Sequence, residues 1–247
     1  MFCQLHTVPI FRIFLQGIVR TVVVVFLLVI LVAPQSFGQG SNNPFFFTPL
    51  NIENGLSQQT VNAIFQDADG YMWFATRNGL NRYDGYEFKI FRKDYRDAHS
   101  LCGNEILCIT QDSAKDLWVG TIEGINRIDY ETGKIFRYFL PHDNNIQALY
   151  HTCRNELFIF TNGGAWKYNN QTDSLNRFEF EGLPAEAHIR AVVEDLQKHL
   201  YLGTTQGIYI YDQAHRLIEH IPADPHNPDA LPKGSISFMT VDQSGQI

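Results

Sequence analysis

The chain has 247 residues, of which 45% are hydrophobic and 13% aromatic, and it carries a formal net charge of −7 at pH 7. Its 19 Lys and Arg residues are scattered along the chain, so the sequence offers no basic patch and we expect no nucleic-acid partner. The length is sufficient for a sizeable hydrophobic core in a repeat protein.

The first 38 residues have the composition of a secretory signal peptide. They contain no acidic residue, and Arg12 and Arg20 precede the unbroken apolar run Thr21–Ala33. A positive flank, an apolar stretch and small residues at a cleavage site are the parts of such a peptide. A retained membrane anchor is the alternative, but a span of about 20 residues would include Arg20. The composition therefore predicts export, with residues 1–38 as the signal peptide.

Residues 39–53 form an N-terminal segment that contains the aromatic run Phe45–Phe47, a candidate strand. From residue 54 onward the sequence repeats one pattern four times. Each copy has an aromatic anchor, with a threonine three residues beyond it and a glycine six residues beyond it. The anchors are Trp73, Trp118, Phe158 and Tyr201, separated by 45, 40 and 43 residues. A period of about 40–45 residues is the length of one propeller blade, so the repeat predicts an all-β propeller of four-stranded blades.

The first copy shows the strands that we expect in each blade. Four runs rich in β-branched and aromatic residues are separated by Gly, Asn and Asp. They are Val61–Gln66, Met72–Thr76, Leu80–Tyr83 and Glu87–Phe91. No stretch after the N-terminus keeps a helical period for ten residues, which excludes a helical fold.

Other positions of the repeat have predicted structural roles. The residue six before the anchor opens the turn between the first two strands, because a short polar side chain accepts a nearby backbone N–H. These residues are Asp67, Asp112, Thr152 and Asp195. The repeated glycine begins the third strand, where we expect a positive φ. Small residues ten before the anchor suit a crowded axis beside the innermost strand. They are Ala63, Cys108, Ala148 and Ala191. The anchors are expected to fill the space between neighbouring sheets.

A fifth copy starts near the end of the chain. Ile236–Val241 matches the first strand, and Asp242 takes the turn position. We therefore expect residues 54–247 to form an incomplete propeller of four blades and the start of a fifth, within a seven-bladed whole. The strand at Phe45–Phe47 is a candidate to complete the last blade. On this interpretation the chain is an N-terminal fragment.

Three cysteines follow the predicted signal peptide: Cys102, Cys108 and Cys153. In an oxidising compartment two of them could pair and leave one free. Alternatively, Cys108 is a small buried residue, because it occupies the alanine position of the other copies. No Cys and His spacing matches a zinc site, and Asp67–Gly70 lacks the downstream ligands of a calcium loop. We expect no metal and no cofactor.

Two segments resemble the two-component regulator propeller repeat. They are "DADGYMWFATRNGLNRYDG", which follows "NGLSQQTVNAI", and "DSAKDLWVGTIEGINRID". The matching motifs are a Gly-Leu-Ser start and the exits Asn81–Asp84 and Asn126–Asp129. The third copy departs from the pattern with Thr152, Phe158 and Lys167.

The resemblance implies the periplasmic sensor region of a Bacteroidetes hybrid two-component system. In that family a membrane helix, a histidine kinase and a response regulator follow the propellers, and oligosaccharides are the usual ligands. The family thus implies further blades, a downstream kinase region and a homodimer as partners, and an inner-membrane location for the full-length protein. None of the downstream parts is in this sequence, so we expect no enzymatic activity and no catalytic residue in it.

If the propeller binds a ligand, we expect the loops between second and third strands to contact it, because they vary while the strands repeat. The candidates are Arg77, Asn78, Glu123, Asn162 and Gln206. The alternative for each is an ordinary solvated turn residue. Two functions remain open from these residues: a sensor that binds a glycan, or a stand-alone secreted propeller acting as an enzyme on polysaccharides or as an adhesion or scaffold protein.

Overall fold

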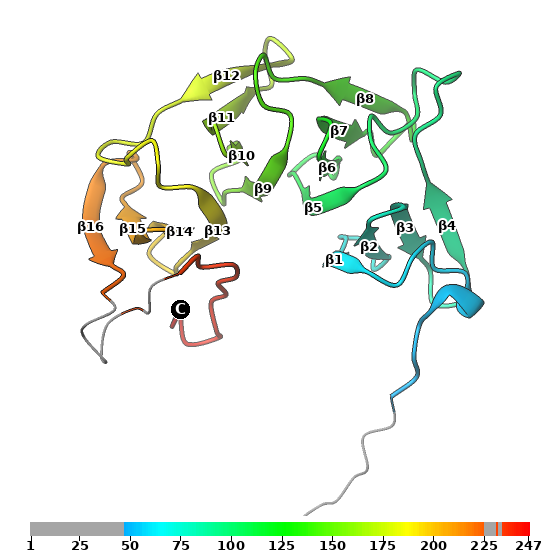
Figure 1. The fold of residues 1–247 in the computed structure, drawn as a ribbon, viewed down its shortest axis with the longest axis horizontal. Coiled ribbons are helices and arrows are strands. Elements are labelled where there is room, and N and C mark those ends of the chain that lie inside the picture. Colours follow the sequence, from blue (N-terminus) through cyan, green and yellow to red (C-terminus); the bar gives the residue numbers. More distant parts are fainter. Residues whose placement is uncertain (1–46, 225–230, 232–233) are drawn as a thin grey trace, which may run out of the picture. The chain divides into compact units, whose positions relative to one another are not determined.

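The computed structural model describes residues 47–224, 231 and 234–247 (Figure 1). The predicted signal peptide and the first two residues of Phe45–Phe47 lie outside this part. Phe47 itself is 89% exposed and in no strand. Within the described residues, no helix is long and apolar enough to cross a membrane. The chain divides into two compact units, Met1–Thr48 and Pro49–Ile247, and every element below belongs to the second.

The described strands, sixteen in number, form four antiparallel sheets that each take four strands in chain order. Blade 1 comprises β1 (Val61–Gln66), β2 (Met72–Thr76), β3 (Gly79–Tyr83) and β4 (Phe88–Phe91). Blade 2 comprises β5 (Ile106–Gln111), β6 (Leu117–Thr121), β7 (Ile125–Ile128) and β8 (Ile135–Tyr138). Blade 3 comprises β9 (Ile146–His151), β10 (Leu157–Thr161), β11 (Gly164–Asn169) and β12 (Ser174–Phe178). Blade 4 comprises β13 (Ile189–Glu194), β14 (Leu200–Thr204), β15 (Gly207–Tyr211) and β16 (Leu217–Pro222).

The all-β propeller architecture is confirmed. The first strands of successive blades pack beside one another on the inner side, and the fourth strands lie on the outer side (Figure 1). In blade 1 the strand bounds match the predicted ones to within one residue. One short 3₁₀ helix, η1 (Ile52–Asn54), precedes the blades and is capped by Asn51, whose side chain accepts the Glu53 N–H at 2.8 Å.

The hydrophobic core lies between the blades. Three clusters fill the three junctions between successive sheets, and each draws residues from both neighbours. As predicted, the anchors are central to them: Trp73 is 5% exposed, and Trp118 and Phe158 are fully buried. Tyr201 is only half-buried and belongs to none of the three clusters, because no further described sheet packs on its side of blade 4.

Three of the small residues of the first strands, Ala63, Cys108 and Ala148, pack in these junction clusters. In blade 2, Cys108 is paired with Gly120 on the neighbouring strand. A Cβ added to Gly120 would lie 2.5 Å from Cys108 Sγ and 2.9 Å from Ile146 Cβ of blade 3. Gly120 therefore has no room for a side chain, because Cys108 and blade 3 pack directly onto it.

The predicted turn and glycine roles are confirmed. Asp67 Oδ1 accepts the backbone N–H groups of Asp69 and Tyr71 at 3.0 and 2.9 Å. The repeated glycines all have positive φ. They are Gly79 (121°), Gly124 (150°), Gly164 (127°) and Gly207 (120°). In the fifth copy, Asp242 Oδ1 accepts the N–H of Ser244 at 2.8 Å, so the same turn forms there.

Ile236–Val241 forms no strand, contrary to the prediction. Ile236 does occupy the expected position: its N–H donates to Thr204 O at 3.3 Å, and its side chain lies against Gly203. A ladder needs a second strand to pair with, and none is present in the described part of this copy.

Candidate functional site

The hairpins between second and third strands stand at one end of the blades, together with the longer connections that lead from each fourth strand to the next blade. The predicted ligand residues all lie in these hairpins, as expected from the repeat. They are Arg77, Asn78, Glu123, Asn162 and Gln206. Of these five residues, Asn162 lines the cavity described below, and the other four line neither that cavity nor the second one.

A repeated threonine holds each hairpin. In blade 1, Thr76 Oγ1 donates to Gly79 O at 2.8 Å and accepts the Asn78 N–H at 3.1 Å. Equivalent bonds occur at Thr121, Thr161 and Thr204. The hairpin backbone is thus tied to a buried side chain in every blade, and only the residues at the tip are free to differ.

Two of the predicted residues are engaged in contacts between chain segments. Glu123 forms an ion pair with Lys93 in the connection before blade 2, and this hydrogen bond raises the pKa of Lys93. Arg77 Nε lies 3.6 Å from Glu105 Oε1 in the same connection. These ion pairs give Arg77 and Glu123 a structural role, because they hold the connection between blades 1 and 2, and no ligand is needed to account for them.

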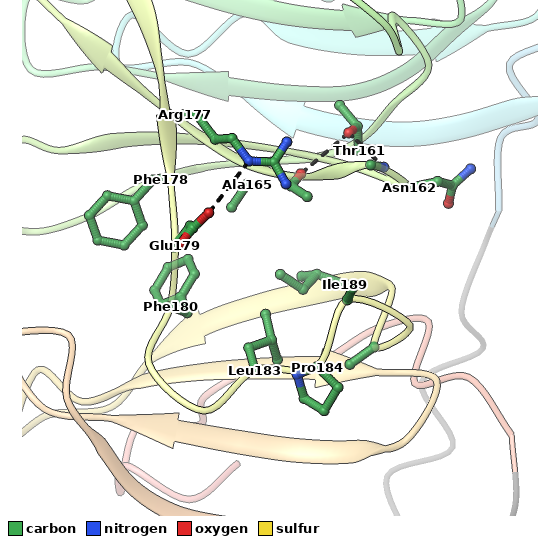
Figure 2. Close-up of a pocket in the computed structure, with 14 residues that line it drawn as sticks. Thr161, Asn162, Ala165, Arg177, Phe178, Glu179, Phe180, Leu183, Pro184 and Ile189 are labelled. Atoms are coloured by element: carbon green, nitrogen blue, oxygen red, sulfur yellow. Dashed lines mark hydrogen bonds and ion pairs between the residues drawn. The ribbon is translucent and has the colours of Figure 1, made fainter.

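Asn162 is the predicted residue that lines the larger cavity, which lies between blades 3 and 4 and measures about 300 Å³ (Figure 2). We call this cavity the blade 3–4 cleft. One wall is the hairpin of blade 3 with Arg177 and Glu179 at the end of β12, and the other is the connection 180–188. The apolar lining consists of Ala165, Phe178, Phe180, Leu183, Pro184, Ala185, Ala187 and Ile189.

The polar groups of the cleft stand at its rim. The guanidinium of Arg177 covers Gly164, where an added Cβ would lie 3.2 Å from Arg177 Nη2. Arg177 Nε is 3.8 Å from Glu179 Oε1, and both side chains are more than half exposed. A loose, solvated pair of this kind costs little to separate, so both groups can turn to a ligand.

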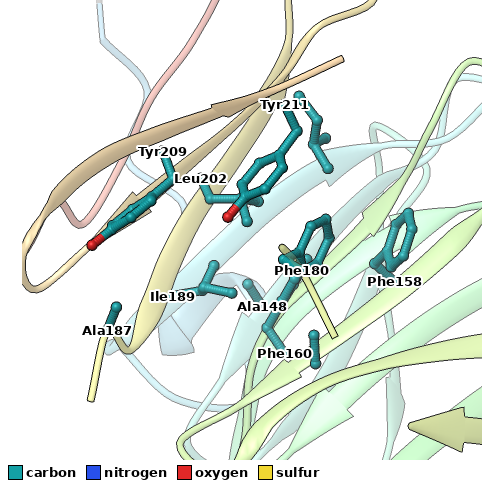
Figure 3. Packing of buried hydrophobic residues seen from close by; sticks show 11 residues of the cluster. Ala148, Phe158, Phe160, Phe180, Ala187, Ile189, Leu202, Tyr209 and Tyr211 are labelled. Atoms are coloured by element: carbon teal, nitrogen blue, oxygen red, sulfur yellow. The ribbon is translucent and has the colours of Figure 1, made fainter. Parts of the chain in front are cut away.

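The apolar wall is continuous with the core of the junction (Figure 3). The ring of Phe180 lies 5.5 Å from that of Phe158 and 5.0 Å from that of Tyr211. Phe180, at the start of the connection, is therefore anchored in the junction, and the residues that follow it line the cleft.

The connection to blade 4 lacks a hydrogen bond that the first two connections have. In the first two connections an asparagine lies fourteen residues before the anchor of the next blade. Its side chain accepts a backbone N–H from the start of the same connection, two residues beyond the fourth strand. The bonds are Lys93 N to Asn104 Oδ1 at 2.8 Å and Leu140 N to Asn144 Oδ1 at 2.6 Å. In the third connection this position is Ala187, which has no side-chain acceptor. The third connection therefore lacks this hydrogen bond between its two ends.

The polar side chains of the cleft are suited to bind a ligand. Its ionisable lining groups are Arg177 and Glu179, which can form ion pairs and hydrogen bonds. Elsewhere in the described residues, no cluster of His, Cys, Asp or Glu has the arrangement of a metal site. Arg177, Glu179 and Phe180 were not among the predicted residues. The signal that could have indicated them is the loss of the asparagine at Ala187.

The first two blades share a further network at the start of each repeat. The Ser57 N–H donates to Asn81 Oδ1 at 2.8 Å, and Ser57 Oγ lies 2.8 Å from Thr76 Oγ1. In blade 2, Cys102 takes the place of the serine and its N–H donates to Asn126 at 2.8 Å. This network explains why Ser or Cys begins the repeat and Asn follows the glycine.

The family profile described as "Two component regulator propeller" matches residues 55–78 and 100–123. These two windows contain Ser57, Cys102 and the hairpin threonines Thr76 and Thr121, and they end just before Asn81 and Asn126. The chain carries two-component regulator propeller repeats. The sequence register continues through blades 3 and 4, where Trp166 and Tyr209 replace the buried asparagine.

Comparison with curated proteins finds histidine kinase P4 of Formosa agariphila, which is 41% identical over 63 residues. The match covers 26% of the regulator propeller chain and 5% of the kinase. Among solved structures, a catalytically inactive virginiamycin B lyase from Staphylococcus aureus with quinupristin has a TM-score of 0.58 at 18% identity, covering 74% of this chain and 62% of the lyase. A gluconolactonase from Xanthomonas campestris has a TM-score of 0.57 at 16% identity, covering 76% and 68%. Both similarities concern the propeller fold.

Proposed function

We propose that this chain is the ligand-sensing propeller region of a two-component signalling protein, and that the blade 3–4 cleft binds an oligosaccharide. The observation that carries the proposal is the family match in blades 1 and 2, together with the 41% identity to a histidine kinase. The region senses and does not itself catalyse. We place it in the periplasm, with the full-length protein in the inner membrane as a homodimer whose downstream kinase region responds to the propeller.

The cleft has the two kinds of surface that a sugar needs. Leu183 and Pro184 offer an apolar wall for a sugar face, and Arg177, Glu179 and Asn162 offer donors and acceptors for hydroxyl groups. A ligand seated there would touch both blade 3 and the connection to blade 4. Binding would therefore favour one arrangement of the junction, which is how a propeller without catalytic groups can signal.

A stand-alone secreted propeller is the second candidate function. It is favoured by the fold similarity to a lyase and a lactonase. In that case the cleft would be a substrate site, or the protein would act in adhesion.

Isothermal titration calorimetry of the protein with a panel of purified oligosaccharides tests the proposal. We expect saturable binding by at least one sugar, weakened about tenfold or more in Arg177→Ala and Asn162→Ala. Asn78→Ala is the control, since Asn78 lies in the hairpin of blade 1 and does not line the cleft, and this variant should bind as the wild type does.

Ala187→Asn supplies a second arm. It restores the acceptor of the first two connections, so it should close the cleft and weaken binding, whereas Ala185→Asn on the exposed part of the same connection should not. Equal affinity in all these variants would contradict the assignment of the cleft. Cleavage of a bound sugar would favour the enzyme instead.

A further inference from the structure

A second cavity lies between blades 1 and 2, at the opposite end of the strands from the cleft, and measures about 180 Å³. Its walls include the turns that begin at Asp67 and Asp129 and the side chains of Arg82 and Lys89. This volume is below the roughly 300–1,000 Å³ of sites that hold drug-sized ligands, so the cavity suits a small chemical group.

Arg82 and Lys89 are directly opposite each other on β3 and β4. They extend the row that begins with Trp73, which pairs with Arg82, and all three face blade 2. Two like charges in this relation normally destabilise a sheet, so the pair needs a compensating negative charge.

Blades 2 and 3 supply a negative charge from a fixed position of the repeat. Two residues before the anchor, blades 2 and 3 have an acid that pairs with the cation of the third strand. These contacts are Asp116 with Arg127 at 3.7 Å and Glu156 with Lys167 at 2.6 Å. In blade 1 the same position is Tyr71, and the guanidinium of Arg82 lies over its ring, 4.5 Å from the centroid. Blade 1 therefore has the third-strand cation, Arg82, and a second cation, Lys89, but has Tyr71 in place of the acid.

The acids that do line the cavity are engaged elsewhere. Asp67 accepts from the indole of Trp73 and from the backbone of its own turn. Asp69 pairs with Lys115 at 2.7 Å, and Asp129 accepts from Thr132. In the part of the chain that the structure describes, no carboxylate oxygen lies within 4.0 Å of the Arg82 or Lys89 side-chain nitrogens.

We propose that this cavity binds the oxyanion group of a small ligand, a carboxylate or a sulfate, between Arg82 and Lys89. The planar guanidinium suits two oxygens of such a group, and the ammonium of Lys89 supplies a second charge beside it. The rings of Tyr71 and Phe91 hold the two cations in place, since Lys89 Nζ lies 5.1 Å from the Phe91 centroid. The site is independent of the oligosaccharide proposed for the cleft.

The test is calorimetric titration at constant ionic strength with sodium sulfate and with sodium glucuronate, and with glucose as the neutral comparator. We expect saturable binding of at least one anion and none of glucose. Sulfate alone would indicate a free inorganic ion, whereas glucuronate would indicate an anionic group on a sugar.

Three variants locate the binding. Lys89→Gln, at an exposed position, should weaken it about tenfold. Tyr71→Glu gives blade 1 the acid of blades 2 and 3, and should abolish binding without lowering the melting temperature. Arg96→Gln removes an equal charge from an exposed loop and should leave binding unchanged. Failure of both anions to saturate, or equal affinity in Lys89→Gln and Arg96→Gln, would overturn the proposal.

Discussion

The indole N–H of Trp118 donates to Asp112 Oδ2 over 2.8 Å, while Asp112 Oδ1 accepts the backbone N–H groups of Ala114 and Asp116. One carboxylate thus joins a turn at the blade end to the side chain that fills the junction with blade 3. In blade 3, where the anchor is Phe158, the turn residue is Thr152. A phenyl ring has no polar hydrogen to bind, so the second carboxylate oxygen would have no partner there.

This relationship predicts strong coupling between Asp112 and Trp118. Asp112→Thr leaves the buried indole N–H without an acceptor and should cost about 1–3 kcal/mol of unfolding free energy. The double variant Asp112→Thr/Trp118→Phe recreates the pair of blade 3 and should lose less than the sum of the two single variants. Urea unfolding of all four proteins in a double-mutant cycle measures the coupling. Strictly additive losses would show that the two side chains act independently.

Two glycines of blade 1 separate backbone strain from steric overlap. Gly70 has φ of 90° and open space around its Cβ position, so Gly70→Ala should cost only about 1–2 kcal/mol, the strain of the left-handed conformation. Gly79 has φ of 121°, and an added Cβ would lie 2.7 Å from Phe91 O. Gly79→Ala should cost about 1–3 kcal/mol more, because strands β3 and β4 must move apart. Thermal melts of both variants give the comparison, and equal melting temperatures would contradict it.

His215 should make the junction of blades 3 and 4 sensitive to pH. Its ring lies edge-on to Phe158 and Phe178, and Arg154 Nη2 donates to its Nε2 at 3.0 Å, which requires the neutral ring. Burial lowers the pKa of His215 below its ordinary 6.5, and the charges of Arg154 and Lys167 act in the same direction against the carboxylate of Glu156.

The folded state therefore binds this proton less readily than the unfolded chain does. Stability from the neutral ring is complete above pH 6.5 and is lost as the pH falls from there toward the lower folded pKa. His215→Gln should flatten this part of the curve of unfolding free energy against pH. The exposed His142→Gln is the control and should keep the wild-type slope. A slope unchanged in His215→Gln would exclude this residue as its source.

The three described cysteines are free thiols with different surroundings. Burial raises the pKa of the Cys108 thiol to about 12 and also raises that of Cys102, while Cys153 is exposed. An aromatic disulfide reagent should label Cys153 in the native protein, and Cys102 and Cys108 only after denaturation. Peptide mapping identifies the labelled sites, and a Cys153 that resists the reagent would point to a disulfide instead.

The fold was predictable from sequence because propeller packing repeats in the chain. The anchors Trp73, Trp118 and Phe158 occupy equivalent junctions, so the sequence period equals the spatial period. Cys108 is the small packing residue that the repeat predicts. Its crowding comes from Ile146, 38 residues away, and the repeat alone does not show which face of a strand the next blade covers.

The candidate sites were harder to predict because they arise where the repeat fails. Asn162 is a predicted hairpin residue that does line the cleft, but the hairpin pattern gives no sign of the opposite wall, where Ala187 stands in place of an asparagine. Arg82 looked like an ordinary member of the Asn-Arg motif. Its unusual surroundings depend on Tyr71, which replaces an acid, and on Lys89 across the ladder.

The three clusters at the junctions mean that no blade owns a complete core. The blade is the repeating unit of the sequence. The unit that must pack well, however, is a junction, which is made of the facing surfaces of two neighbouring blades. A newly copied blade carries one surface for each of its two junctions. It can therefore be inserted whole and still pack against both neighbours. Substitutions within a blade are less free, since a change such as Trp to Phe at the anchor becomes harmless only when its turn residue changes with it. Lineages of such repeats should therefore gain and lose whole blades readily, while individual junctions drift through paired replacements.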